Sequence, residues 1–121
     1  MTTRVLVVDD AKFMRHMLRN ILTGIGCDVV GEAGDGSEAC EKYEQLTPDI
    51  VTMDIVMPKL GGLDALKQIK NKNPNAKVVM ISAIDQREPL MEALKLGAVD
   101  YVVKPFEKER VEEALKRVMA G

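Results

Sequence analysis

Five short runs of apolar residues, rich in valine and isoleucine, recur along the chain. They cover residues 4–9, 28–33, 49–54, 77–82 and 99–103. Runs of this length and composition are typical of β-strands. Some, such as residues 5–8 and 78–81, are continuously apolar rather than alternating, which is the pattern of strands in a parallel sheet with helices on both faces. The sequence therefore predicts five central, parallel strands.

Helical patterns lie between these runs and after the last one. The first and the last place apolar residues on one face and polar residues on the other, as amphipathic helices do. Their apolar positions are Met14, Met17, Leu18, Ile21 and Leu22, and Val111, Ala114, Leu115, Val118 and Met119. Three further helices are expected over residues 37–46, 63–72 and 86–96, each ended by proline, asparagine-proline or glycine. The chain is thus predicted to contain five βα units.

Strict alternation of strand and helix, with right-handed crossovers, is compatible with an open doubly wound sheet or with a closed barrel. A barrel needs eight such units and about 250 residues, whereas this chain has 121 residues. We therefore predict an α/β fold, (βα)5, with a doubly wound five-stranded parallel sheet and helices on both faces. Because domains commonly contain about 100 to 200 residues, residues 1–121 are expected to form a single domain.

Composition and charge narrow the classes of function. With 17 basic and 19 acidic residues the net charge is −2, which gives no general attraction to nucleic acids or anionic membranes. Cys27 and Cys40 lack the spacing of metal ligands and are predicted to be reduced thiols. The sequence contains no secretory signal and no apolar stretch long enough to span a membrane. We therefore expect a cytoplasmic protein that binds neither nucleic acid nor membrane.

The residues that follow the strands carry the candidate chemistry. Asp9 and Asp10 end the first run, Asp54 ends the third and Ser82 the fourth, and Lys104 follows the fifth. Ligands of open parallel sheets bind at the carboxyl ends of the strands, so these residues are expected at one edge. Helix capping by Asp10 or a turn at Asp54 would explain the acids without a ligand. A solvated Ser82 hydroxyl and a purely structural ion pair of Lys104 are also open.

Electrostatics favours a bound cation at this edge. Two carboxylates about 5 Å apart repel each other by about 3 kcal/mol at an effective dielectric constant of about 20, and a third increases the repulsion several-fold. One lysine does not neutralise three carboxylates, whereas Mg²⁺ prefers such oxygen ligands and also binds phosphate oxygens. The pattern therefore predicts a Mg²⁺-assisted phosphoryl site. Asp54 would be the nucleophile that forms an acyl phosphate, and Lys104 and Ser82 would contact the other phosphoryl oxygens.

Four separated motifs resemble those of response-regulator receiver domains, and among these the single-domain chemotaxis regulators of the CheY type most closely. They are Asp9-Asp10, residues 53–58 (MDIVMP), Ser82-Ala83 and residues 101–106 (YVVKPF), each at the end of a different predicted strand. The match extends over essentially the whole chain. The resemblance implies the flavodoxin-like strand order 2-1-3-4-5, which is the order known for this family and is not a result of spacing.

The resemblance also implies a metal site and a phosphorylation site. Asp54 would be the phosphoacceptor, and Lys104 would pair with the phosphoryl group. Mg²⁺ would be held by three carboxylates and one backbone carbonyl, those of Asp9, Asp10, Asp54 and Val56. Several chemotaxis members carry polar side chains at the positions of Val56 and Ile84, so the resemblance leaves the lifetime of the phosphorylated state open.

A switch is implied as well. Ser82 would move toward the phosphoryl group and leave space into which Tyr101 turns, which changes the face built from the fourth helix, the fifth strand and the fifth helix. Such a change is a population shift between two arrangements. The Lys104–Pro105 peptide bond is expected to be cis by resemblance, although only about 5% of such bonds are cis in folded proteins.

As a function, the resemblance implies a phosphorylation-activated response regulator of a two-component system, with a histidine kinase as phosphodonor. It would not be an enzyme, beyond promoting its own phosphorylation and dephosphorylation. The expected output is chemotaxis, through binding of a monomer to the flagellar motor switch that controls flagellar rotation, with a phosphatase as a further partner. Gly121 closes the last helix without a linker, which favours a free-standing chain. A phosphorelay intermediate and a receiver fragment of a DNA-binding response regulator remain open.

Three other readings of the motifs are weaker. A phosphohydrolase that forms an aspartyl phosphate, as haloacid dehalogenases do, would carry a second acid where Val56 stands. Flavin binding would place a phosphate beside Asp9 and Asp10, which would repel it. Residues 34–39 fit the nucleotide-binding pattern G-x-G-x-x-A, but Asp35 would face the pyrophosphate, and a turn that leads into an N-capped helix explains the run.

Overall fold

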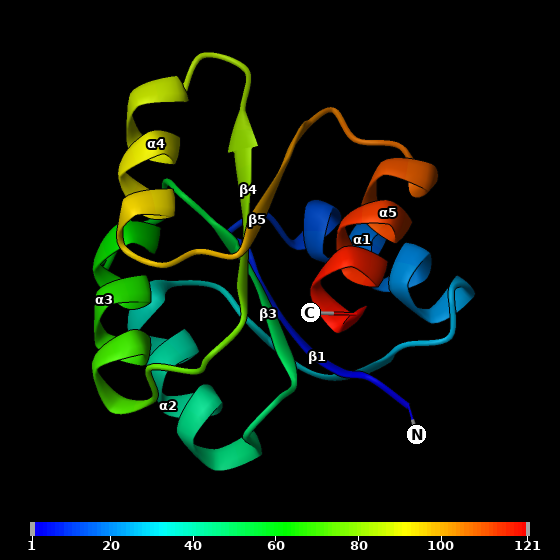
Figure 1. Ribbon diagram of the computed structural model, residues 1–121, viewed down its shortest axis with the longest axis horizontal. Coiled ribbons are helices and arrows are strands. Elements are labelled where there is room, and N and C mark those ends of the chain that lie inside the picture. The colour runs from blue at the N-terminus through cyan, green and yellow to red at the C-terminus, as the bar shows by residue number, and fades with distance from the viewer. Residues whose placement is uncertain (1, 121) are drawn as a thin grey trace.

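The computed structural model describes residues 2–120 and contains five strands that alternate with five helices (Figure 1). The strands are β1 (Arg4–Val8), β2 (Asp28–Ala33), β3 (Ile50–Asp54), β4 (Val78–Ala83) and β5 (Asp100–Lys104). The helices are α1 (Lys12–Gly24), α2 (Gly36–Leu46), α3 (Gly62–Lys72), α4 (Arg87–Lys95) and α5 (Lys108–Ala120). Each predicted strand is present, within one residue of its predicted bounds. The predicted closure of the last helix by Gly121 lies outside the described residues.

The five strands form one parallel sheet in the order β2-β1-β3-β4-β5. The predicted α/β fold and the strand order 2-1-3-4-5 are therefore confirmed. In the register of the two central strands, Val8 of β1 lies opposite Met53 of β3. The next residues, Asp9 and Asp54, consequently emerge side by side at the carboxyl edge of the sheet.

Helices cover both faces of the sheet, and each face has its own apolar core. Figure 1 shows α1 and α5 on one side and α2, α3 and α4 on the other. Successive residues of β1 point alternately to the two layers, as the pleat of a strand requires: Val5 and Val7 join the core under α1 and α5, and Leu6 and Val8 join the other core. The continuously apolar runs in the sequence follow from burial on both sides.

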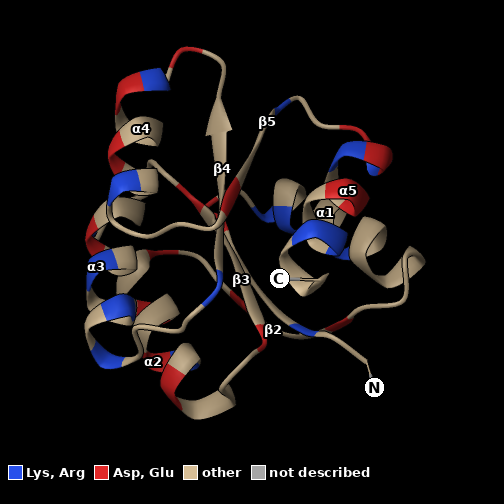
Figure 2. Ribbon diagram, in the orientation of Figure 1, with Lys and Arg blue, Asp and Glu red and all other residues tan. Residues whose placement is uncertain are grey.

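The outer faces of the helices carry mixed charges. Bands of blue and red lie along α3, α4 and α5 in Figure 2, as expected for solvated helix faces. Within residues 2–120, no helix is both long and apolar enough to cross a membrane.

Candidate metal centre

Three carboxylates meet at the carboxyl edge of the two central strands. Asp9 and Asp10 directly follow β1, and Asp54 is the last residue of β3. One oxygen atom from each of the three carboxylates lies within 4.8 Å of the other two. Asp9 and Asp54 are buried, whereas Asp10 is exposed. The structure thus brings together the three acids that the sequence placed at one edge.

Lys104 reaches this cluster from the edge strand β5, across β4. Its Nζ lies 3.0 Å from Oδ2 of Asp9 and 3.3 Å from Oδ1 of Asp54. The peptide bond between Lys104 and Pro105 is cis, which is the isomer that the resemblance implies. One ammonium group is therefore shared between two of the three acids.

Negative charge is in excess in this cluster. Burial, followed by the negative charge of Asp9, raises the pKa of Asp54 to about 6, although Lys104 acts in the opposite direction. Burial of Lys104 works to lower its pKa, but its hydrogen bond to Asp9 and the charges of both acids outweigh burial, so this pKa is raised. The acid is harder to ionise and the lysine is harder to deprotonate, which indicates a site that would accept more positive charge.

The donor set fits a hard divalent cation. Mg²⁺ binds oxygen ligands at about 2.0–2.1 Å, so opposite ligands of one ion are about 4 Å apart. Neighbouring ligands of an octahedral ion are about 3 Å apart, and the three carboxylate oxygens all lie within 4.8 Å of one another, so they are near enough to share one ion. Val56 follows β3 by two residues and is 60% exposed, so this segment of the chain lies at the surface.

Every polar group of Asp9 has a partner. Its N–H donates to the Ala33 carbonyl at 3.0 Å, and its Oδ1 accepts from the N–H of Ala11 at 2.9 Å. Its Oδ2 accepts from Lys104, and its carbonyl accepts from Nη1 of Arg15 at 2.6 Å. The contact from Arg15 could not be predicted from the sequence, because a basic residue on the polar side of an amphipathic helix ordinarily faces solvent.

The proposed capping role of Asp10 is wrong. Ala11 is the N-cap residue of α1, and no side chain caps that helix. Asp9 instead accepts the hydrogen bond from the Ala11 N–H, because the chain turns into the helix directly after β1. The exposed Asp10 carboxylate is therefore not occupied by the helix terminus.

Close backbone packing fixes the chain after Asp54. The N–H of Ile55 donates to Oδ1 of Asp54 at 3.1 Å, and the N–H of Gly62 donates to the Ile55 carbonyl at 2.8 Å. A Cβ atom on Gly62 would lie 2.1 Å from the carbonyl oxygen of Asp54. Glycine is thus required where α3 begins, because helix and strand approach each other here without space for a side chain.

Ser82 and Tyr101 line one cavity beside α4. Ser82, in β4, is buried, and its Oγ has no hydrogen-bond partner among residues 2–120. The alternative of a solvated Ser82 hydroxyl is therefore wrong. The cavity measures about 390 Å³ and is also lined by residues of α4, among them Leu90 and Met91. Tyr101, in β5, is 37% exposed, so its ring lies at the surface and not in the core.

The G-x-G-x-x-A run has a structural explanation. Asp35 is the N-cap of α2, where its Oδ1 accepts from the N–H of Glu38 at 2.9 Å. The N–H of Gly36 donates to the Leu60 carbonyl at 2.8 Å, and a Cβ atom on Gly36 would lie 2.3 Å from that oxygen. The glycine is needed for this close approach, so the predicted turn and N-capped helix are confirmed.

Comparison with known proteins gives one consistent result. The family model of the response regulator receiver domain matches residues 5–116. The chain is 55% identical to the chemotaxis protein CheY of Thermotoga maritima over 118 residues, which is 98% of each protein, and 51% identical to that of Listeria monocytogenes, with coverage of 94% and 96%. It matches a chain of the CheX-CheY-BeF3-Mg²⁺ complex from Borrelia burgdorferi with a TM-score of 0.92 and 37% identity, over 97% of this chain and 89% of that one.

These matches agree with the observed sheet and with the acids at its edge. They extend over nearly all of the chain, so the resemblance is not confined to one motif. The chain therefore belongs to the family of response regulator receiver domains, and its relatives include CheY chemotaxis proteins.

Proposed function

We propose that this chain is a phosphorylation-activated response regulator of a two-component system, in which Asp54 accepts a phosphoryl group from a histidine kinase in the presence of Mg²⁺. The observation that carries the proposal is a buried Asp54 carboxylate in an excess of negative charge, 3.3 Å from the Lys104 ammonium. The related complex from Borrelia burgdorferi contains BeF3 and Mg²⁺, which supports the same chemistry here.

The residues at the sheet edge have separate tasks in this proposal. With a pKa of about 6, Asp54 is largely ionised at neutral pH, so its oxygen attacks phosphorus while the bond from phosphorus to the donor imidazole breaks. Lys104 and Ser82 contact the phosphoryl oxygens. Asp9, Asp10, Asp54 and the Val56 carbonyl hold the cation. Bound Mg²⁺ supplies positive charge next to the phosphoryl oxygens.

The output is a change of surface around the Ser82 cavity. An unpartnered, buried Ser82 hydroxyl gains a hydrogen bond when it moves to a phosphoryl oxygen, and that movement enlarges the space that Tyr101 also lines. The phosphoryl group then shifts the population toward an arrangement with the ring of Tyr101 turned inward. The altered face is built from α4, β5 and α5.

The partners of this face belong to the proposal. Residues 1–121 act as a single receiver domain that signals in chemotaxis, the process that the names of the CheY relatives give. The monomer does so by binding a flagellar motor switch protein. A phosphatase that removes the phosphoryl group is a further partner. The chain is not a multiple-turnover enzyme, because Val56 stands where a phosphohydrolase would carry a second acid.

Phosphorylation by a small donor tests the central claim. Incubation with acetyl phosphate and Mg²⁺, followed by intact-protein mass spectrometry, is expected to show one added phosphoryl group. Asp54→Asn should abolish the addition, whereas Asp64→Asn, at an exposed acid on α3, should leave it intact. Labelling of Asp54→Asn at the original level would disprove the assignment of the phosphoacceptor.

Binding with and without a phosphoryl mimic tests the output. A peptide or domain of a motor switch protein, titrated in the presence of BeF3 and Mg²⁺, is expected to bind several-fold more tightly than in their absence. Ser82→Ala should reduce that difference because the hydroxyl that responds to the mimic is gone. Equal affinity in the two states would reject the proposed switch.

A further inference from the structure

The guanidinium group of Arg15 lies between the acidic cluster and the second strand. Arg15 is the fourth residue of α1, and only 18% of its side chain is exposed. Its Nη1 donates to the Asp9 carbonyl at 2.6 Å, and its Nε donates to Oε1 of Glu32 at 3.1 Å. A Cβ atom on Gly34 would be 3.6 Å from the same Nη1. The group is therefore enclosed by β1, β2 and the turn after β2.

The carbonyl that Arg15 holds belongs to the peptide group that joins Asp9 to Asp10. Rotation of this peptide group changes the directions in which both side chains leave the backbone. The other polar atoms of Asp9 are engaged by Ala33, Ala11 and Lys104. Arg15 supplies the remaining contact, and it is the one that reaches the shared peptide. A charge-assisted hydrogen bond of this kind is stronger than one between neutral groups.

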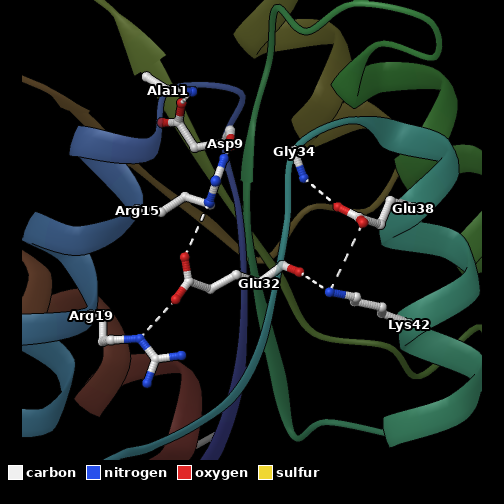
Figure 3. Close-up of polar contacts among 8 residues, drawn as sticks. All are labelled: Asp9, Ala11, Arg15, Arg19, Glu32, Gly34, Glu38 and Lys42. Carbon is white, nitrogen blue, oxygen red and sulfur yellow. Dashed lines mark hydrogen bonds and ion pairs between the residues drawn. The ribbon is translucent and has the colours of Figure 1, made fainter.

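Glu32 gives Arg15 a fixed partner. Figure 3 shows the Glu32 carboxylate between Arg15 and Arg19, whose Nε lies 2.8 Å from Oε2. The backbone carbonyl of Glu32 accepts from Nζ of Lys42 on α2. Glu32 is thus held by helices on both faces of the sheet: its Oε1 accepts from Arg15, its Oε2 accepts from Arg19, and its backbone carbonyl accepts from Lys42. The planar guanidinium thus donates to the Asp9 carbonyl and to Glu32 from two nitrogens in a fixed relative geometry, which the single ammonium nitrogen of lysine does not reproduce.

We propose that Arg15 is a positioning residue for the metal site: it fixes the Asp9–Asp10 peptide group so that both carboxylates point toward Asp54 and a shared divalent cation. This inference rests on the proposed function, since it concerns the same Mg²⁺. The charge of Arg15 and its hydrogen bond affect Mg²⁺ affinity in opposite directions. A guanidinium near a cation site repels the cation, so loss of the charge alone would strengthen Mg²⁺ binding. Loss of the hydrogen bond to the peptide would weaken it.

Direct titration of the metal-free chain with Mg²⁺ alone, by calorimetry, tests this inference. Arg15→Gln is expected to weaken Mg²⁺ binding about 10-fold, at the lower end of what loss of an outer contact costs a metal site. Arg15→Lys keeps the charge without the planar fork, so it should also weaken binding several-fold. Arg19→Gln is the matched control: it removes the same charge from the same helix and from the same Glu32, and its affinity should stay equal or increase.

The outcomes separate a positioning role from a merely structural one. Thermal unfolding of each metal-free variant shows whether it is folded, and only folded variants are compared; if Arg15→Gln is unfolded, Arg15→Lys decides in the same way. Unchanged or tighter binding by the Arg15 variant would overturn the inference. So would equal weakening by Arg19→Gln, which would assign the effect to packing of α1 on β2. If the unmodified chain does not bind Mg²⁺, the proposed function itself is contradicted.

Discussion

Asp54 shows how one buried carboxylate links stability to function. Its pKa is raised from 3.8 to about 6 by burial and by the charge of Asp9, so the folded chain binds a proton there more tightly than the unfolded chain does. The protonated carboxyl of Asp54 therefore adds to the free energy of unfolding. This stabilisation is complete below about pH 3.8 and is lost as the pH rises through about 6. The pKa difference of about two units between the folded and the unfolded chain corresponds to about 3 kcal/mol. An ionised, reactive Asp54 therefore costs stability.

The first prediction concerns Asp54→Asn without metal. The variant lacks the charge that opposes folding, so its free energy of unfolding should exceed that of the unmodified chain by about 1–3 kcal/mol near pH 7.5 and by nearly nothing at about pH 4. Urea denaturation at the two pH values, in the presence of a chelator, measures the difference. Asp64→Asn, at an exposed site, serves as control. A variant that is less stable near neutral pH would contradict the raised pKa.

A second prediction concerns the unpartnered hydroxyl of Ser82. Burying a hydroxyl without a hydrogen bond is unfavourable, so Ser82→Ala should leave stability unchanged or raise it by about 1 kcal/mol. Thr52→Val removes a second buried, unpartnered hydroxyl, in β3, and should have a similar effect on urea denaturation. Only the Ser82 variant should show a reduced response to BeF3. A stability loss of several kcal/mol in Ser82→Ala would mean that the hydroxyl has a partner in solution.

At the scale of elements, the junction between β3 and α3 determines the position of Asp54. The third prediction is that Gly62→Ala lowers the free energy of unfolding by about 1–3 kcal/mol. The Cβ atom of the new alanine would overlap the Asp54 backbone, and such overpacking destabilises the fold. Gly61→Ala is the matched control, since its Cβ would lie 3.7 Å from the Ile55 carbonyl oxygen, an ordinary contact. Equal stability of the two variants would show that the junction can widen freely.

The elements and their polar ends were predictable, but the contacts between them were not. Apolar periodicity depends on burial, so it located the strands within one residue and placed Asp9, Asp54 and Lys104 at one edge. The contact from Arg15 to the Asp9 carbonyl depends on how α1 packs against β2, and no sequence period reports that packing. The sequence also allowed Asp10 to be the N-cap residue of α1, but that residue is Ala11, one position later.

At the scale of the whole molecule, a bound cation should stabilise the entire fold. Because Mg²⁺ binds the site only when β1 and β3 are in register, binding adds to the free energy of unfolding by mass action, about 2.7 kcal/mol at a concentration 100 times the dissociation constant. This fourth prediction is checked by thermal unfolding with increasing Mg²⁺, and a chelator should reverse the gain. Asp9→Asn should reduce the shift, whereas Asp64→Asn should not. Equal shifts in all three chains would indicate binding elsewhere.

Chain length and alternation of elements were sufficient to exclude a barrel and to predict the open sheet. They did not determine the strand order, because several orders satisfy the same alternation and the same right-handed crossovers. That order came from the family resemblance and is confirmed by the sheet. Likewise, the excess of acids at this edge could be predicted, but not the distances between the carboxylates, which the folded chain brings within 4.8 Å of one another.

The sheet divides the interior into two apolar compartments, and this division has an evolutionary consequence. Leu22 lies in the compartment under α1 and α5, and Leu66 lies in the opposite one. Substitutions that share no neighbours act additively, within about 0.5 kcal/mol. A lineage can therefore remodel the side chains behind one surface while those behind the other stay as they are, and new recognition properties can arise there without repeated compensation across the strands.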